Sequence, residues 1–132
     1  MQIGVYGSGY LGTVISACLA DFGTPVTCCH PDSSRMVEMA QGNIPFHEKN
    51  LTEVIRRNVR CGRLVYSTDI ESFARKAQFI FLAEDSPRHI VDLPQRIAKL
   101  SPRPPVMAIV TPVPVGTASK IEQKLKEKQF KF

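Results

Sequence analysis

Short apolar runs alternate with segments of helical periodicity along this chain. The apolar runs predict strands over residues 2–6, 26–29, 64–66, 79–83 and 106–110. Between them, apolar residues recur at spacings of three and four, which predicts helices over residues 11–19, 36–40, 51–59, 69–77, 90–100 and 118–128. Such alternation favours a parallel sheet with helices on both faces, joined by right-handed crossovers. We therefore expect a doubly wound α/β fold with about five strands in the order 3-2-1-4-5.

The length and composition of the chain are those of one ordinary globular domain. It has 132 residues, of which 43% are hydrophobic and 22% charged, and we assign residues 1–132 to a single domain. The longest uninterrupted apolar run, Phe79–Ala83, is far shorter than the roughly 20 residues of a membrane-spanning helix, so we expect no membrane association. The opening residues contain no basic leader and no cleavage site. We therefore expect a cytoplasmic, reducing location.

Net charge and cysteine spacing exclude some functions and leave others open. The formal charge is +5, which suits a nucleic acid or a phosphorylated ligand. Lysines crowd the last predicted helix, but Glu122 and Glu127 interleave with them and no aromatic stacking surface accompanies them, which argues against nucleic-acid binding. The four cysteines form no Cys-x-x-Cys pair and lack histidines at zinc-binding spacing, so we expect no metal site.

A glycine-rich turn follows the first predicted strand and opens the first predicted helix. It reads Gly7-Ser8-Gly9-Tyr10-Leu11-Gly12, which fits the pattern G-x-G-x-x-G. In that pattern the first glycine permits a tight turn, the second lets a pyrophosphate approach the backbone, and the third lets helix and strand pack closely. Unpaired amides at Gly9, Tyr10 and Leu11 would face the anion. The turn thus indicates a Rossmann-like dinucleotide site, and the alternative is a glycine turn kept for packing alone.

The end of the second predicted strand bears on the choice of cofactor. A carboxylate there normally binds the adenosine ribose hydroxyls, but this chain has His30. Ser33, Ser34 and Arg35 follow it and offer donors suited to a 2′-phosphate, which favours NADP over NAD. An alternative remains open: that the site has lost cofactor discrimination, or cofactor binding altogether, and that the two serines merely cap a helix.

Several further segments match one known family. They are Ala17-Cys18-Leu19-Ala20, Val26-Thr27-Cys28, Gly42-Asn43-Ile44-Pro45-Phe46, Gly62-Arg63-Leu64, Ser67-Thr68-Asp69 and Val113-Pro114-Val115-Gly116-Thr117. With the glycine turn, they make nearly the whole chain resemble the N-terminal NAD-binding domain of the UDP-glucose and GDP-mannose dehydrogenases. The resemblance implies oxidation of the 6-hydroxyl of a sugar nucleotide, such as UDP-glucose, to a carboxylate in two NAD-dependent steps. It also implies a central helix and a C-terminal domain, which the residues of this chain do not match.

The chain departs from the family pattern near the expected cofactor. His30 stands where the family has an aspartate, and the family's Gly-Thr-Pro turn corresponds to Asp85-Ser86-Pro87, so the resemblance makes Ser86 a candidate cofactor contact. Carboxylates at positions 84 and 85 would repel a pyrophosphate if they point inward and would be harmless if they point outward. Pro112 replaces the family's active-site threonine, which leaves Thr111 as the candidate substitute.

The family's chemistry requires a nucleophile that this chain does not show. The resemblance implies a covalent adduct on a cysteine of the C-terminal domain, in a Gly-Gly-x-Cys-Phe-Pro-Lys context. None of the four cysteines stands in that context. We therefore assign no catalytic residue and expect the chain alone to be inactive as an oxidoreductase.

The fifth predicted strand is expected to form an exposed edge, because the family continues with a sixth strand beyond it. Such an edge favours pairing with a second copy in a homo-oligomer or with a partner chain. The rival interpretation of the whole chain is a degenerate, non-catalytic Rossmann module that binds a partner or a nucleotide.

Overall fold

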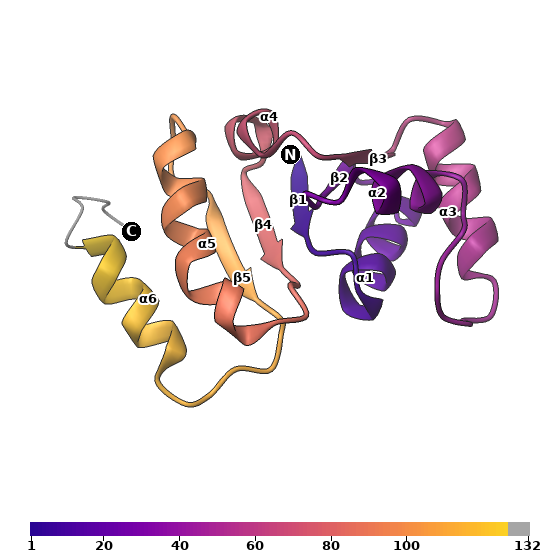
Figure 1. The fold of residues 1–132 in the computed structure, drawn as a ribbon. Coiled ribbons are helices and arrows are strands. Elements are labelled where there is room, and N and C mark those ends of the chain that lie inside the picture. The colour runs from indigo at the N-terminus through magenta and orange to yellow at the C-terminus, as the bar shows by residue number, and fades with distance from the viewer. Residues whose placement is uncertain (127–132) are drawn as a thin grey trace.

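The computed structural model describes residues 1–126, which contain one parallel sheet of five strands. The strands are β1 (Ile3–Tyr6), β2 (Val26–Cys29), β3 (Leu64–Ser67), β4 (Phe79–Leu82) and β5 (Val106–Ile109). Their order is β3-β2-β1-β4-β5, which confirms the expected Rossmann-like topology (Figure 1). Ile3 of β1 aligns with Val26 on one side and with Phe79 on the other. The carboxyl ends of β2 and β4 therefore flank the carboxyl end of β1.

Helices cover both faces of this sheet. They are α1 (Tyr10–Asp21), α2 (Ser33–Ala40), α3 (Leu51–Arg60), α4 (Ile70–Lys76), α5 (Pro87–Leu100) and α6 (Thr117–Lys126). α1 and α3 pack together on one face, α4, α5 and α6 cover the other, and α2 packs against β3 and α3 (Figure 1). Within residues 1–126, none of these helices combines the length and the apolar character needed to cross a membrane.

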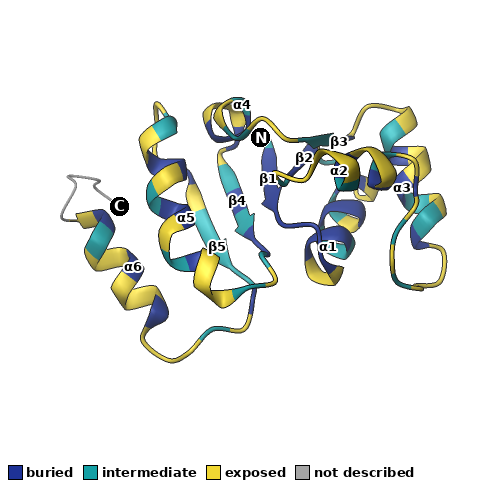
Figure 2. Ribbon diagram, in the orientation of Figure 1, coloured by how far each residue is buried: buried dark blue, intermediate teal, exposed yellow. Residues whose placement is uncertain are grey.

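The central strand shows how the sequence produces these two layers. Ile3 and Val5 pack in the cluster with α1 and α3, whereas Tyr6 packs with α4 and α5, because alternate side chains of a strand point to opposite faces. At Gly4 the ring of Phe73 from α4 fills the side-chain position, since a built Cβ would lie 2.7 Å from that ring. Figure 2 shows β1 as buried along its length. An apolar strand of this kind requires cover on both faces.

The observed helices differ from the predicted ones at their ends. α5 begins at Pro87 rather than at residue 90, because a proline in the first turn sacrifices no hydrogen bond. α2 is capped by Asp32, whose carboxylate accepts the N–H of Arg35 at 3.0 Å, so the suggested serine cap is wrong. α6 begins at Thr117, and residues 127–128 of the predicted last helix lie outside the described residues.

Candidate functional site

The turn between β1 and α1 has a backbone that only glycine fits. Gly7 has a φ of +133°, and a Cβ built on it would overlap the carbonyl oxygen of Ala83 after β4. Its N–H donates to the carbonyl oxygen of Cys29 at 3.1 Å. A Cβ on Gly12 would lie 2.5 Å from the Gly7 carbonyl oxygen. The first and third glycines of the motif thus bring α1 close to the ends of β1, β2 and β4.

The N-terminus of α1 opens at the carboxyl edge of the sheet. Gly9 is its N-cap, has an extended backbone and supplies no side-chain cap. The Gly9 carbonyl oxygen accepts the N–H and the hydroxyl of Thr13 at 3.0 and 2.7 Å. Tyr10 and Leu11 are exposed, and their amides belong to the first turn, which has no intrahelical acceptors. This arrangement offers an anion several N–H donors and the positive end of a helix dipole.

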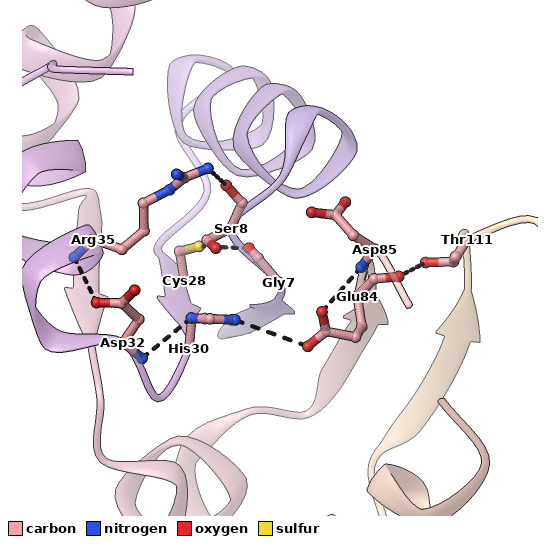
Figure 3. A network of polar contacts seen from close by, with 9 residues as sticks. All are labelled: Gly7, Ser8, Cys28, His30, Asp32, Arg35, Glu84, Asp85 and Thr111. Carbon is pink, nitrogen blue, oxygen red and sulfur yellow. Dashed lines mark hydrogen bonds and ion pairs between the residues drawn. The ribbon is translucent and has the colours of Figure 1, made fainter. Parts of the chain in front are cut away.

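A chain of contacts joins the end of β2 to the glycine turn (Figure 3). Nδ1 of His30 accepts the N–H of Asp32 at 3.2 Å, and Asp32 in turn caps Arg35. The Arg35 guanidinium donates to the carbonyl oxygen of Ser8 at 3.0 Å. Its Nε is buried and has no hydrogen-bond partner among the described residues. His30 and Arg35, both predicted from the sequence, therefore lie beside the glycine turn.

The structure adds a contact that the sequence does not predict, between His30 and the carboxylate of Glu84. Nε2 of His30 is 3.9 Å from Oε2 of Glu84, whose other oxygen accepts the N–H of Asp85 at 3.0 Å (Figure 3). Glu84 follows β4 and His30 follows β2, and they meet because both strands pair with β1. The signal that could have found this contact is the strand order, not residue spacing. An acid from β4 thus stands next to the position that normally carries an acid at the end of β2.

Asp85 points toward the N-terminus of α1 (Figure 3). A Cβ built on Gly9 would overlap the carboxylate oxygens of Asp85. Of the two orientations left open by the sequence, Asp85 therefore has the inward one, while Glu84 turns toward His30. The next residue, Ser86, is the N-cap of α5, and its side chain makes no cap hydrogen bond. Negative charge from the chain itself thus occupies the space over the second glycine of the motif.

Thr111, which follows β5, holds the loop after β4 in place. It is buried, and its hydroxyl donates to the carbonyl oxygen of Glu84 at 2.6 Å (Figure 3). The structure therefore gives Thr111 a positioning role for the turn that carries Glu84 and Asp85. Contacts of Thr111 and Ser86 with a cofactor stay predictions.

A cavity of about 550 Å³ lies next to this cluster, between the ends of β2 and β4 and the side of α5. Residues from all three elements line it, among them His30, Pro31, Glu84, Arg88, His89 and Arg96. Its volume is in the range of small-ligand sites, roughly 300–1,000 Å³. A mainly apolar cavity of about 500 Å³ between β5, α5 and α6 shares no residue with the glycine turn, and its lining within residues 1–126 contains no basic group for a phosphate.

The buried cysteines are unsuited to nucleophilic chemistry. Cys28 and Cys29 lie in β2, and burial raises the pKa of each thiol to about 12. Cys18 and Cys61 are exposed and lie outside the cluster of Figure 3. In the part of the chain that the structure describes, no three or more His, Cys, Asp or Glu side chains are placed to hold a metal ion.

The sequence matches one protein family over residues 1–132, the UDP-glucose/GDP-mannose dehydrogenase family, NAD binding domain. It is 35% identical to the UDP-glucose 6-dehydrogenase YwqF of Bacillus subtilis over 136 residues, covering 96% of this chain and 31% of that protein. It is 28% identical to the UDP-glucose 6-dehydrogenase of Rhizobium meliloti, covering 96% of this chain and 31% of that protein. The chain thus spans less than a third of the length of these relatives, and the resemblance seen in its motifs is confirmed.

Solved structures share the fold. A GDP-mannose dehydrogenase from Pseudomonas aeruginosa superposes with a TM-score of 0.87 at 23% identity, over 97% of this chain and 32% of that one. The UDP-N-acetyl-mannosamine dehydrogenase Cap5O from Staphylococcus aureus superposes with a TM-score of 0.84 at 17% identity, over 100% of this chain and 34% of that one. At these identities the likeness shows the Rossmann-like architecture.

Proposed function

The chain belongs to the UDP-glucose/GDP-mannose dehydrogenase family, as its NAD-binding domain, and from this premise we propose that it binds NAD at the carboxyl edge of the sheet. The pyrophosphate would lie on the amides of Gly9, Tyr10 and Leu11, across the ends of β1 and β4. The observation that carries the proposal is the glycine turn. No side-chain hydrogen bond caps the first turn of α1, and the space over Gly9 is occupied only by the exposed carboxylate of Asp85, at the end of a rotatable side chain.

We propose NAD rather than NADP as the cofactor. Glu84 stands beside His30, where its carboxylate would accept hydrogen bonds from ribose hydroxyls and repel a 2′-phosphate. Arg35, on which the expectation of NADP rests, already donates to the carbonyl oxygen of Ser8. The description of the matched family as an NAD-binding domain supports the same choice.

The cavity beside His30 is our candidate for the adenosine half of the cofactor. Its walls come from the ends of β2 and β4, which flank the strand that carries the glycine turn. In doubly wound folds, ligands bind outside the carboxyl ends of the strands, where the strand order reverses. β1 is that point here, since β2 lies on one side of it and β4 on the other.

For the complete protein we propose NAD-dependent oxidation of a sugar nucleotide such as UDP-glucose. Both curated relatives carry the name UDP-glucose 6-dehydrogenase, and this chain covers 31% of each. When bound, NAD supplies the hydride acceptor of such an oxidation. The residues of this chain would bind and orient it, and Cys28 and Cys29 are too deeply buried to act as nucleophiles. We expect residues 1–132 alone to bind the cofactor without turnover.

Isothermal titration calorimetry with NAD and NADP in parallel tests the cofactor site. We expect tighter binding of NAD, and we expect Glu84→Gln to narrow the preference by roughly 10-fold, because it removes the charge that would repel a 2′-phosphate. Arg35→Ala should leave the preference for NAD in place. Gly9→Ala should weaken binding while circular dichroism shows an intact fold, since Gly9 has an ordinary negative φ and its Cβ would meet only the rotatable carboxylate of Asp85. If neither NAD nor NADP bound, the proposal would be rejected and the non-catalytic module favoured.

We also propose that the outer edge of β5, which pairs only with β4 among the strands of residues 1–126, pairs with another strand, from a second copy or from a partner chain. β5 stands at one end of the sheet order, and natural proteins rarely leave such edges unprotected. We likewise propose a cytoplasmic location, which the four free thiols support, because reducing compartments keep cysteines unpaired.

A further inference from the structure

We propose that Asp85 competes with the diphosphate of a dinucleotide for the N-terminus of α1. This inference rests on the proposed cofactor site and adds to it a residue that sets how tightly the cofactor binds. The Asp85 carboxylate occupies the space over Gly9, where a Cβ would overlap it (Figure 3). A dinucleotide would reach the amides of the first turn only after the Asp85 side chain has rotated away from Gly9.

The surrounding backbone holds Asp85 at this place. On one side, Thr111 donates to the carbonyl oxygen of Glu84 at 2.6 Å, which ties the loop to the end of β5. On the other side, Ser86 begins α5 as its N-cap. Asp85 is the single residue between these two anchored neighbours, and it is exposed. Displacement of the carboxylate therefore requires rotation of the side chain and no movement of the loop.

No oppositely charged side chain of the described residues pairs with the Asp85 carboxylate. No ion pair found in residues 1–126 includes Asp85, whereas its neighbour Glu84 has His30 at 3.9 Å. The Asp85 carboxylate instead lies over Gly9, at the N-terminus of α1, where the unpaired amides of the first turn and the positive end of the helix dipole favour a negative charge. A pyrophosphate bound to these amides would lie beside the carboxylate and would repel it at close range. The two anions therefore exclude each other.

Asp85→Asn tests this competition, because it keeps the size of the side chain and removes its charge. We expect calorimetric titration at low ionic strength to show NAD affinity increased on the order of 10-fold. The gain should shrink at 1 M salt, where the Debye length falls to about 3 Å. Glu122→Gln is the matched control, since it removes one negative charge from α6, where Glu122 pairs with Lys126. NAD affinity of this control should equal that of the wild type.

Thermal unfolding with inorganic pyrophosphate gives a second readout that does not need a dinucleotide. Without ligand, Asp85→Asn should melt at a lower temperature, because α1 loses the charge at its N-terminus. Pyrophosphate should then raise the melting temperature of the variant more than that of the wild type.

The outcomes separate this inference from the proposed function. Equal NAD affinities of variant and wild type, with equal responses to pyrophosphate, would overturn the role of Asp85 and leave the NAD site standing. If neither protein binds NAD but pyrophosphate stabilises the variant more strongly, the competition at α1 holds and the proposed dinucleotide function fails.

Discussion

At the scale of single residues, Gly12 decides how closely α1 approaches the turn after β1. A Cβ there would lie 2.5 Å from the carbonyl oxygen of Gly7 and 3.0 Å from its carbonyl carbon, and neither backbone atom can rotate away. Gly12→Ala gains about 1 kcal/mol of helix propensity. It also costs roughly 1–3 kcal/mol of overpacking. We expect the contact to outweigh the propensity, so that urea denaturation gives a lower free energy of unfolding.

Gly62→Ala is the control for that variant. No atom lies within 4 Å of a Cβ built on Gly62, whose φ of +77° leaves only the cost of a left-handed backbone, roughly 1–2 kcal/mol. Because Gly62 is remote from the glycine turn, this variant should keep the NAD affinity of the wild type, whereas Gly12→Ala should reduce it. A Gly12→Ala protein more stable than the wild type would contradict the close packing of helix and turn.

Burial divides the cysteines into two reactive and two inert thiols. Cys18 and Cys61 are exposed, while burial raises the pKa of Cys28 and Cys29 to about 12. Thiolates attack disulfide reagents, and a thiol with a pKa of about 12 forms almost no thiolate, so the buried pair should not react near neutral pH. We expect such a reagent to label two thiols in the native chain and all four in urea, as mass spectrometry of the cysteine-containing peptides would show. Rapid native labelling of Cys28 would show that β2 is less well covered than the structure indicates.

At the scale of secondary-structure elements, one carboxylate ties α1 to α3. Asp21 ends α1 and accepts hydrogen bonds from Nε and Nη2 of Arg57, at 2.8 and 2.6 Å, and from Nδ2 of Asn58 at 2.9 Å. The bonds from Arg57 and then Asn58 lower the pKa of Asp21 to about 2. A carboxylate at a helix C-terminus is otherwise disfavoured by the helix dipole. The bonds to α3 offset that effect and hold the two helices together.

This contact makes stability depend on acidity. Since the folded-state pKa of Asp21 lies below its ordinary value of 3.8, the contact stabilises the fold above that pH and is lost as the pH falls toward 2. We expect Asp21→Asn to lose less free energy of unfolding than the wild type between pH 4 and about pH 2, in urea titrations. Glu71→Gln, which breaks an exposed pair with Arg75 within α4, should behave as the wild type does. If the free energy of unfolding fell equally with pH in Asp21→Asn and in the wild type, the proposed dependence of stability on the ionisation of Asp21 would be refuted.

Periodicity in the sequence predicts where these elements lie better than where they end. Apolar runs identify each of the five described strands, because a strand inside a parallel sheet must be apolar on both faces. The start of α5 at Pro87 lies outside the apolar pattern, since the first turn of a helix buries little. The cap of α2 could chemically have been Asp32, Ser33 or Ser34. The backbone geometry selects Asp32, and the pattern of apolar residues in the sequence does not reveal that geometry.

At the scale of the whole molecule, strand order assembles a site whose parts the sequence reveals unequally. The glycine turn is local, so its residues and its place after β1 follow from the motif alone. The contact of His30 with Glu84, and that of Gly9 with Asp85, join segments distant in the sequence. They arise because β2 and β4 both pair with β1. The inward direction of Asp85 depends on side-chain rotation, which no spacing of residues determines.

The same strand order places β5 at one end of the sheet and predicts how its amides exchange with solvent. The N–H groups of Val106 and Val110 donate to carbonyl oxygens on the β4 side at 3.0 and 3.1 Å. Because amides alternate along a parallel ladder, those of Met107 and Ile109 face away from β4. We expect hydrogen exchange followed by NMR to show faster exchange for these two amides than for Val5, in the centre of the sheet. Equal protection of edge and centre would mean that another segment covers β5.

Repeating this exchange at low and high protein concentration distinguishes the possible occupants of the edge. Pairing with a second copy should protect Met107 and Ile109 as concentration rises, while the amides of β1 stay unchanged, because association by edge strands adds hydrogen bonds only at the new contact. Sedimentation in the same buffer should show the matching increase in mass. Association without protection at β5 would assign the homo-oligomer to another surface. A monomer with fast edge amides at every concentration would exclude the second copy and leave a partner chain as the proposed occupant.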